Sequence, residues 1–363
     1  MHRITLIPGD GIGPEVTRAA CEIVLASAAQ VEFEEVPAGQ RGEREYGTPL
    51  PSAVFDSIAQ THLALKGPTA TPFGGTYRVP IERKDANGIP VKRSYPSIAI
   101  ALRKELGLFV NVRPIKRYPG VESRFEHVDL IIFRENSEDL YVGAERMLDE
   151  GTAEAIKIIS LRASERVARF ALEYMRKLGR HKLTIGHKAN VMKMTDGLFL
   201  STAQQTAKEF PDILVNQRVV DALCMELVMK PETFDGLLLP NLYGDIVSDL
   251  AAGLVGGLGV APGANFGEGC AMFEAVHGTA PDIAGKDLAN PTASILSAVM
   301  MLQYLGESDA AARIVDALSA VLQDRQAVTA DLGGTAGTRQ MARACRPDST
   351  PRAIARGDGG IDA

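Results

Sequence analysis

Two apolar patterns alternate along this chain from its first residues to about residue 323. Residues 3–7 and 236–239 form short apolar runs typical of buried strands. Residues 160–178 and 308–323 instead repeat apolar side chains at helical spacing. Strand patterns that alternate with helix patterns predict an α/β protein built around a central sheet, although they do not give the order of its strands.

Length, composition and charge exclude several classes of protein. With 363 residues the chain is long enough for a large core, and its size favours two lobes. A hydrophobic fraction of 45% is typical of a soluble globular protein. The net charge of −6 argues against a general nucleic-acid binder, because phosphate contacts require a basic surface.

The sequence has no feature of a membrane or secreted protein. We find no apolar stretch of about 18 residues, so we expect no membrane span. The first residues pass directly into a strand-like run without a signal-peptide pattern, and we expect the protein in the cytoplasm. The four cysteines are scattered without CxxC spacing, which argues against a disulfide framework.

Two segments predict local geometry at the start and end of helices. Gly9, Gly11 and Gly13 resemble half of a dinucleotide fingerprint, but their spacing is GxGxG rather than GxGxxG, so they do not predict a Rossmann fold. Pro14 lies near the first position of the helix that follows. Asn290 is a predicted N-cap, with Pro291 at the first helical position.

Asp245 and Asp249 are the first candidates for a metal site. They lie four residues apart at the start of an apolar, helical run, so both carboxylates can project from one face. Carboxylate oxygens suit Mg²⁺ or Mn²⁺, whereas zinc prefers His and Cys ligands, which this segment lacks. The alternative is that two acids near a helix N-terminus only stabilise the helix dipole.

Arginines at the ends of predicted elements are candidates for binding an acid. Residues 97–113 are predicted to form a helix that leads into a strand, with Arg103 and Arg113 on either side of that transition. Arg134 follows the strand-like run 130–133. Three guanidinium groups can converge on a polycarboxylate, because each offers two parallel donors. Taken singly, each arginine is more often part of a surface ion pair.

Two more segments have both a functional and a plain structural interpretation. Lys188 follows the predicted strand 182–186 and is either a proton shuttle or a surface charge. Residues 79–95 contain an Asn-Gly pair that favours a hairpin, together with the charged residues Arg83, Lys84, Lys92 and Arg93. This hairpin either reaches over the site to bind an anionic group or is a solvated surface element.

Several long motifs together resemble one family. GDGIGPEV, LRKEL, NVRP, RENSEDLY, HKAN, NLYGDIVSDLAAGLVGGLG and HGTAPDIAGKDLANPTA occur in this order. The chain resembles the β-decarboxylating dehydrogenases, the isocitrate and isopropylmalate dehydrogenase family, over about residues 3–340. It is most similar to the NAD-dependent isocitrate dehydrogenase branch.

The resemblance implies a fold, an assembly and a domain division. The expected fold is α/β with two domains around central sheets, and it is not of the Rossmann type. The large, cofactor-side domain would comprise residues 1–108 and 256–345, and the small central domain residues 109–255. A segment at about 138–160 would form the dimer, and the resemblance leaves open whether dimers assemble further. Residues 346–363 would be a disordered tail.

The same resemblance implies roles for particular residues, carried over motif by motif. Tyr141 would donate a proton, and Lys188 of the partner subunit would assist the transfer. Ser97, Arg103, Arg113 and Arg134 would bind the substrate. Asp245, Asp249 and the partner's Asp221 would bind Mg²⁺ or Mn²⁺. The cofactor would contact His277, Gly278, Thr279, Ala280, Asp282, Ile283 and Asn290.

The residues after HGTAP predict NAD as the cofactor. In the family, NADP enzymes tend to place a basic residue and a tyrosine there, whereas this chain has Asp282 and Ile283. A carboxylate accepts a hydrogen bond from the ribose 2′-hydroxyl but repels a 2′-phosphate.

The identity of the acid is less constrained. In the isocitrate branch a Ser-x-Asn pair usually contacts the distal carboxylate, and here the segment is Ser97-Ile98-Ala99. We expect oxidative decarboxylation of isocitrate or a close analogue such as homoisocitrate or a phosphono analogue. The alternatives are a 3-isopropylmalate, tartrate or malate-type dehydrogenase and, from another class, a non-catalytic regulatory subunit of a heteromeric enzyme.

Overall fold

One ten-stranded mixed sheet runs through the whole protein. The computed structural model describes residues 1–72, 74, 77–84 and 89–347. In the described residues the strand order is β11-β10-β12-β7-β6-β13-β14-β3-β1-β2. These strands are β1 (His2–Ile7), β2 (Val31–Glu35), β3 (Leu63–Lys66), β6 (Leu108–Lys116), β7 (Asp129–Glu135), β10 (Lys182–His187), β11 (Leu214–Val219), β12 (Gly236–Leu239), β13 (Pro262–Gly267) and β14 (Ala271–Ala275).

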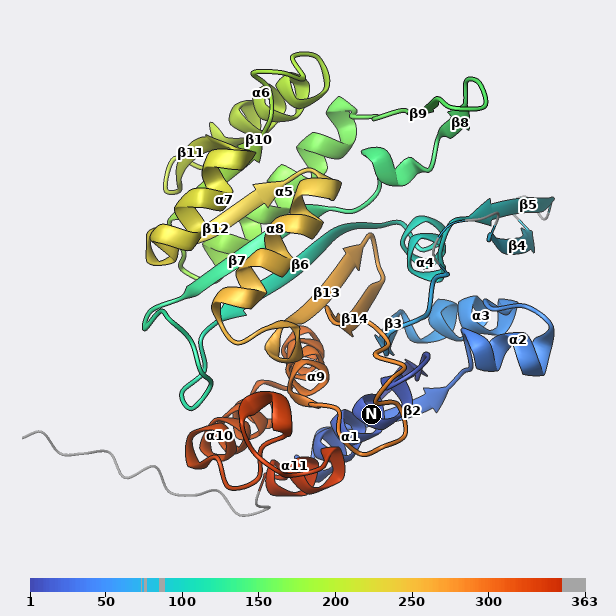
Figure 1. Ribbon diagram of the computed structural model, residues 1–363, viewed down its shortest axis with the longest axis vertical. Coiled ribbons are helices and arrows are strands. Elements are labelled where there is room, and N and C mark those ends of the chain that lie inside the picture. The colour runs from blue at the N-terminus through green and yellow to red at the C-terminus, as the bar shows by residue number, and fades with distance from the viewer. Residues whose placement is uncertain (73, 75–76, 85–88, 348–363) are drawn as a thin grey trace, which may run out of the picture.

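The sheet consists of two parallel halves that run in opposite directions. Strands β2, β1, β3 and β14 are parallel to one another, as are β7, β12, β10 and β11. Three antiparallel pairings, β14 with β13, β13 with β6 and β6 with β7, join the halves. This central antiparallel part lies between the two parallel halves (Figure 1).

Helices cover both halves. The half built around β1, β3 and β14 carries α1 (Gly13–Ala26), α2 (Gln40–Tyr46), α3 (Ser52–Thr61), α4 (Ile98–Glu105), α9 (Thr292–Leu305), α10 (Ser308–Asp324) and α11 (Thr338–Ala344). The other half carries α5 (Leu161–Lys177), α6 (Thr195–Ala207), α7 (Val220–Met229) and α8 (Asn241–Leu254). Short 3₁₀ helices are η1 (Leu140–Val142), η2 (Pro231–Thr233), η3 (Leu258–Val260) and η4 (Ala330–Leu332).

Helix burial follows from composition. Nearly every residue of α9 is apolar or small, and its first eleven residues are all buried, between the sheet and helices α1 and α10. In contrast, α5 is charged on one face and apolar on the other, so only the apolar face packs on β6 and β7.

Two small hairpins project from the main body. β4 (Val79–Lys84) pairs with β5 (Pro90–Tyr95), which confirms the predicted hairpin; its Asn-Gly turn lies outside the described residues. β8 (Glu145–Met147) pairs with β9 (Ala153–Ala155) inside the segment predicted to form the dimer. Both hairpins extend to the same side of the molecule (Figure 1).

Most predicted elements agree with the structure, and one boundary is wrong. The strands and helices predicted at residues 3–7, 160–178, 182–186, 236–239 and 308–323 are all present to within one or two residues. The predicted N-cap of α9 is one residue too early, since Pro291 occupies that position. Asn290 still caps the helix end, because its side-chain oxygen accepts a hydrogen bond from the Thr292 N–H at 2.9 Å.

The predicted domain boundaries fall in the middle of the continuous sheet. Residue 108 begins β6 and residue 256 precedes β13, and these two strands are hydrogen-bonded to each other. The division into two domains therefore stays a prediction. The predicted tail, residues 346–363, lies almost entirely outside the described residues.

Two further features can be stated for the described residues. None of their helices is long and apolar enough to cross a membrane. All four cysteines are free thiols, which agrees with the absence of a disulfide framework.

Candidate active site

A row of polar side chains crosses the buried centre of the sheet. Lys66 on β3 is paired with Glu274 on β14, and Asn265 on β13 is paired with Asn111 on β6, in registers that place all four on one face. Asn111 donates a hydrogen bond to Asn265 at 2.8 Å and accepts one from Arg113 at 2.7 Å. The row runs from the first half of the sheet across its antiparallel centre to β6.

Glu274 is the acidic centre of this row. Its carboxylate accepts hydrogen bonds from Lys66 at 2.7 Å and from Asn265 at 2.9 Å, and it lies 3.5 Å from the Arg103 guanidinium. Burial raises the pKa of Glu274, but the charges of Lys66 and Arg103 and the hydrogen bonds outweigh it and hold that pKa at about 2. Glu274 is therefore ionised and holds two cations in place.

The structure brings together the three arginines that were predicted to form an anion clamp. Arg103 comes from α4, Arg113 from β6 and Arg134 from β7. Burial and repulsion from Arg103 and Arg113 lower the pKa of Arg134 to about 9. The Arg103 Nε and one terminal nitrogen of Arg134 are buried without a hydrogen-bond partner. Such crowded, partly unpaired guanidinium groups favour a polyanionic ligand.

Helix α8 presents Asp245 and Asp249 to these arginines, and the 3₁₀ helix η1 places Tyr141 beside them. Arg113 lies 3.4 Å from both carboxylates, and Arg134 donates a hydrogen bond to Asp245. The Tyr141 hydroxyl also donates to Asp245, and its ring lies under the Arg134 guanidinium at 4.9 Å. Burial raises the pKa of Asp245, but the charges of Arg134 and Arg113 and the hydrogen bond from Tyr141 outweigh it and leave that pKa below its usual value.

The two aspartates fit a hard divalent cation. Side-chain exposures of 36% for Asp245 and 54% for Asp249 leave their oxygens accessible, and both carboxylates are ligands of the kind that Mg²⁺ and Mn²⁺ prefer. Within the described part of one chain, no group of three His, Cys, Asp or Glu side chains is placed to hold a metal. Asp245 and Asp249 are thus the two carboxylates of this chain at the predicted metal site, and the third predicted ligand, the partner's Asp221, stays a prediction.

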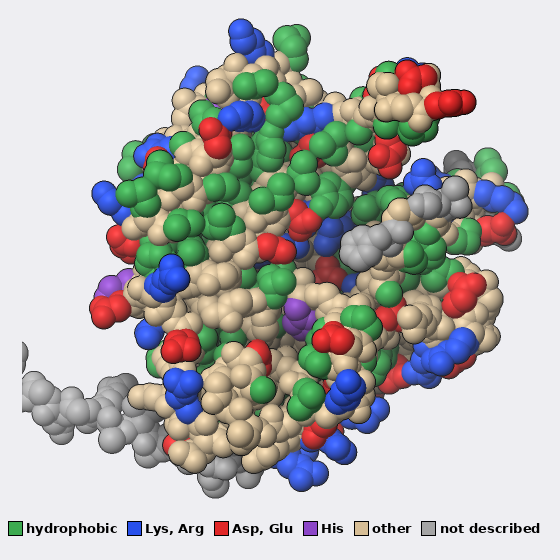
Figure 2. Space-filling view, in the orientation of Figure 1, with side chains coloured by type: hydrophobic (Ala, Val, Ile, Leu, Met, Phe, Trp, Pro, Cys, Tyr) green, Lys and Arg blue, Asp and Glu red, His purple; other side chains and the backbone are tan. Residues whose placement is uncertain are grey.

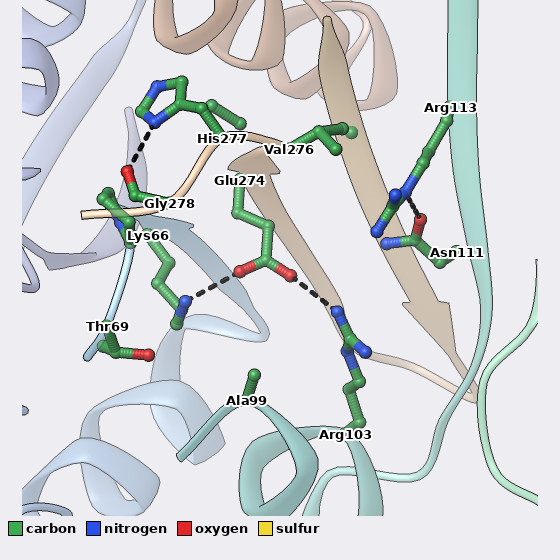
Figure 3. A pocket seen from close by; sticks show the side chains of 13 residues that line it. Lys66, Thr69, Ala99, Arg103, Asn111, Arg113, Glu274, Val276, His277 and Gly278 are labelled. Atoms are coloured by element: carbon green, nitrogen blue, oxygen red, sulfur yellow. Dashed lines mark hydrogen bonds and ion pairs between the residues drawn. The ribbon is translucent and has the colours of Figure 1, made fainter. Parts of the chain in front are cut away.

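A cavity of about 150 Å³ lies between the polar row and α4. Lys66, Arg103, Arg113 and Glu274 line it, together with Ala99 and the start of the loop after β14 (Figure 3). Ser97 caps α4, where its hydroxyl accepts a hydrogen bond from the Ile100 N–H at 3.2 Å, and its contact with substrate stays a prediction. Ala99 presents a methyl group to the cavity (Figure 3).

The predicted cofactor loop begins at this cavity. His277 and Gly278 line it, and the His277 Nε2 is buried without a hydrogen-bond partner. Burial lowers the pKa of His277, so the ring is neutral near pH 7. Gly278 has open space where a side chain would be. An unpaired nitrogen and an unobstructed backbone suit a loop that binds a cofactor.

The rest of that loop packs against the glycine turn after β1. The Gly11 Cα approaches the Thr279 carbonyl so closely that a Cβ would lie 2.0 Å from its oxygen. Ala280 has a positive φ of 37°, and Ile283 packs on the cluster of Ile12 and Val16. Asp282 is exposed, and the Asn290 side-chain amide donates a hydrogen bond to the Asp331 carboxylate at 2.9 Å. The structure thus joins the two glycine-containing segments that the sequence showed separately.

Lys188 and Asp221 do not line this cavity in the same chain. Lys188 follows β10, Asp221 lies in the first turn of α7, and the two form an ion pair of 2.5 Å. This arrangement is compatible with the prediction that they act in the site of a partner subunit, which the structure of one chain does not test.

The charged residues of the β4–β5 hairpin are engaged locally. Arg93 lies 3.0 Å and Arg83 3.8 Å from Glu105 of α4, and Lys92 lies 2.6 Å from Glu82. These contacts favour the interpretation of the hairpin as a structural element, although the Lys84 side chain lies outside the described part.

Sequence reasoning missed Lys66, Glu274 and Asn265. Each lies within or at the end of an otherwise apolar strand, in LALK, AMFEA and PGANFG. A polar residue that interrupts a buried strand is the signal that could have identified them, because such a residue needs a partner on the neighbouring strand.

Figure 2 shows Lys, Arg, Asp and Glu side chains gathered in a hollow between the two halves.

Comparisons with known proteins bear on this site. The family model for isocitrate/isopropylmalate dehydrogenase matches residues 3–345. A probable isocitrate dehydrogenase [NAD] subunit alpha of Caenorhabditis elegans is 44% identical over 92% of this chain and 88% of its own length.

Two further comparisons agree. Isocitrate dehydrogenase [NAD] catalytic subunit 5 of Arabidopsis thaliana is 43% identical over 94% of this chain and 86% of its own length. The crystal structure of isocitrate dehydrogenase from Methylococcus capsulatus superposes with a TM-score of 0.88 and 46% identity, and the match covers 95% of this chain and 98% of that one.

Proposed function

Because this chain belongs to the isocitrate/isopropylmalate dehydrogenase family, we propose that it is a catalytic subunit that oxidatively decarboxylates isocitrate or a close analogue. The expected fold is confirmed, and the chain is an NAD-dependent decarboxylating dehydrogenase that uses Mg²⁺ or Mn²⁺. The exact acid and the catalytic role of this subunit are the parts we propose.

One observation supports the proposal above all others. Arg113 and Arg134 pair with the carboxylate of Asp245, Arg113 also lies beside Asp249, and Arg103 is held close by through Glu274. Arg103 and Arg113 line the cavity, and Arg113 in turn contacts both aspartates, so groups that bind carboxylates lie next to groups that bind a divalent ion. A 2-hydroxy acid with carboxylates on neighbouring carbons needs both kinds of group within reach of one another.

The side chains have separate tasks in this reaction. The arginines bind and orient the carboxylates of the acid through paired N–H donors. Tyr141 holds a proton on its hydroxyl beside Asp245 and donates it to the carbon left by decarboxylation. Glu274 keeps Lys66 and Arg103 in fixed positions at the far end of the cavity. Bound NAD supplies hydride acceptance, and a bound divalent ion supplies stabilisation of negative charge.

A homodimer with shared sites is part of the proposal. Helices α7 and α8 expose apolar side chains, shown as a green area in Figure 2: Met225, Val228, Met229 and Ile246. Exposed apolar patches of this kind suit a protein interface. A second copy is also the expected source of a third carboxylate, Asp221, because one chain supplies only two at the site.

The choice of acid depends on the wall of the cavity. Ala99 offers no hydrogen bond, whereas Lys66, Arg103 and Thr69 on the lining offer donors to an anionic end group. We propose isocitrate as the substrate, with homoisocitrate and phosphono analogues as the acids to compare. The predicted location in the cytoplasm stays a prediction.

A spectrophotometric assay of NADH formation tests the proposal. The purified chain alone should reduce NAD with isocitrate or one of these analogues, and only when Mn²⁺ or Mg²⁺ is present. Turnover confined to 3-isopropylmalate, malate or tartrate would contradict the proposed substrate. Absence of turnover with every acid, restored on addition of a second subunit, would instead support the regulatory-subunit alternative.

A further inference from the structure

Lys157 is a buried lysine that no role in the proposed reaction explains. It lies between β9 and α5, and its side chain is 11% exposed. Its ammonium group donates a hydrogen bond to Asp196 at 2.5 Å and lies 3.6 Å from Asp139, and both aspartate side chains are 0% exposed. A buried cation between two fully buried carboxylates is costly to desolvate, so its position is closely specified.

Asp139 connects this lysine to the segment that carries Tyr141. Its two carboxylate oxygens accept hydrogen bonds from the N–H groups of Leu140 and Leu242, both at 2.8 Å. Leu140 opens the 3₁₀ turn η1 that contains Tyr141, and Leu242 lies in the first turn of α8, which carries Asp245. Asp139 thus fixes the proton donor relative to the metal-binding helix.

The backbone at Asp139 is strained, which shows that its position is enforced. Its φ of 71° is rare for a residue other than glycine. The Asp139 N–H donates to the Ile158 carbonyl at 2.8 Å, next to Lys157 in the chain. A costly conformation persists only where the surrounding contacts determine it, and such positions cluster at functional sites.

Asp196 connects the same lysine to the segment that carries Lys188. The second oxygen of Asp196 accepts a hydrogen bond from the Lys188 N–H at 2.7 Å. Asp196 itself lies in the first turn of α6. The Lys157 ammonium also lies 4.6 Å from the ring centre of Tyr243, on α8. The Lys157 ammonium group therefore contacts the two aspartates that hold the segments of Tyr141 and Lys188. It also contacts the metal-binding helix α8 directly, through the ring of Tyr243.

We propose that Lys157 is a positioning residue that fixes Tyr141 and Lys188 of one chain relative to each other. The inference rests on the proposed function, in which Tyr141 acts in the site of its own chain and Lys188 in the site of the partner. Lys157 then links the two active sites of the dimer. Neither group touches Lys157 directly, so its effect passes through Asp139 and Asp196.

A pair of hybrid dimers first tests whether the sites are shared. A Tyr141→Phe chain and a Lys188→Ala chain, carrying different affinity tags, are purified as one dimer. With shared sites, this hybrid keeps one intact site and should have about half of the wild-type activity, while each parent homodimer is nearly inactive. Without complementation the shared-site part of the proposed function fails, whatever the role of Lys157.

Lys157→Met is then added to one chain of this hybrid at a time. On the Tyr141→Phe chain it can affect the remaining site only through Lys188. On the Lys188→Ala chain it can affect that site through Tyr141 and the adjoining helix α8, but not through Lys188. In both arrangements we expect kcat to fall at least about tenfold with KM for the acid within about twofold, because small displacements of reacting groups slow chemistry more than binding. An unchanged kcat in either arrangement would overturn the proposed link.

Two controls separate positioning from general loss of structure. Lys116→Met removes a lysine from an exposed pair with Asp129 at 3.9 Å and should leave kcat unchanged. If the Lys157→Met chain does not fold, Asp196→Asn is used, because it keeps an oxygen for the Lys188 N–H while removing the ion pair with Lys157. It should reduce kcat when placed on the chain that supplies Lys188. A lower melting temperature with unchanged kcat would mean that the cluster is only structural.

Discussion

Lys66 donates a hydrogen bond of 2.7 Å to Glu274, although the two residues are 208 positions apart in the sequence. Both side chains are buried, at 2% and 11% exposure, at the end of adjacent parallel strands. The pair fixes the Lys66 ammonium group and the Glu274 carboxylate in the lining of the cavity. It also joins β3 to β14, and hence the glycine turn after β1 to the cofactor loop.

Replacement of Glu274 should lower the free energy of unfolding by an amount that depends on pH. The pKa of about 2, compared with 4.5 for an ordinary glutamate, corresponds to roughly 3 kcal/mol of stability at pH 7. Because the folded-state pKa is the lower one, this stability is complete above about pH 4.5 and is lost as the pH falls towards 2. Urea unfolding at pH 7 should show Glu274→Gln to be less stable than wild type by about that amount, and the difference should shrink by more than half at pH 3.

A surface pair provides the control for this measurement. Glu82 lies 2.6 Å from Lys92, but the two side chains are 68% and 78% exposed. Glu82→Gln should change the free energy of unfolding by less than about 1 kcal/mol at any pH, because exposed pairs are screened by water. Equal losses in the two variants would contradict the assigned strength of the buried pair.

Replacement of Tyr141 should slow chemistry without weakening substrate binding. The Tyr141 hydroxyl donates to Asp245, and burial raises its pKa, so the group is protonated at neutral pH. Tyr141→Phe removes the proton but keeps the ring under Arg134. We expect kcat to fall by about 10²–10⁴, the usual contribution of a general acid, with KM for the acid changed little. Tyr118→Phe, at a partly buried tyrosine away from the site, should leave kcat unchanged.

Much of this site could be predicted because its motifs are local. Asp245 and Asp249 lie on one helix. The three arginines, Arg103, Arg113 and Arg134, lie in recognisable strand and helix patterns. The fold alone then brings the arginines and the aspartates together. Glu274 and Lys66 could not be paired from the sequence, since nothing local indicates that β14 lies beside β3. The same holds for Asn265 and Asn111, which meet across the antiparallel centre of the sheet.

Aspartate replacement at α8 should act through the metal. Asp249 is half exposed and lies 3.4 Å from Arg113, and burial raises its pKa, so it is the less firmly held of the two carboxylates. Asp249→Asn should increase the Mn²⁺ concentration that gives half-maximal rate by about tenfold or more, since one anionic ligand is lost. EDTA should abolish NADH formation, and added Mn²⁺ should restore it. Asp316→Asn on α10 should need no more Mn²⁺ than wild type; turnover that persists in EDTA would contradict the metal site.

Enlarging Ala99 should interfere with the acid. Its methyl group faces a cavity of about 150 Å³ that Lys66, Arg103, Arg113 and Glu274 also line. Ala99→Leu fills part of this space, and overpacking of a formed site is unfavourable. We expect KM for the acid to rise at least about tenfold, while KM for NAD changes less, in steady-state assays with each substrate varied. Ala99→Ser, which adds only a hydroxyl, should have a KM within about threefold; equal KM in all three proteins would place the acid elsewhere.

The cofactor preference should respond to charge at Asp282. This side chain is exposed on the loop that starts at His277 and Gly278, while Ile283 beside it packs on Ile12. A carboxylate there repels the 2′-phosphate of NADP, and a lysine would attract it. Asp282→Lys should therefore raise kcat/KM for NADP and lower it for NAD, shifting their ratio by at least about tenfold. Lys286→Ala, further along the same loop, should shift the ratio much less. A ratio unchanged by Asp282→Lys would mean that the ribose lies away from this residue, and that another part of the loop sets the preference for NAD.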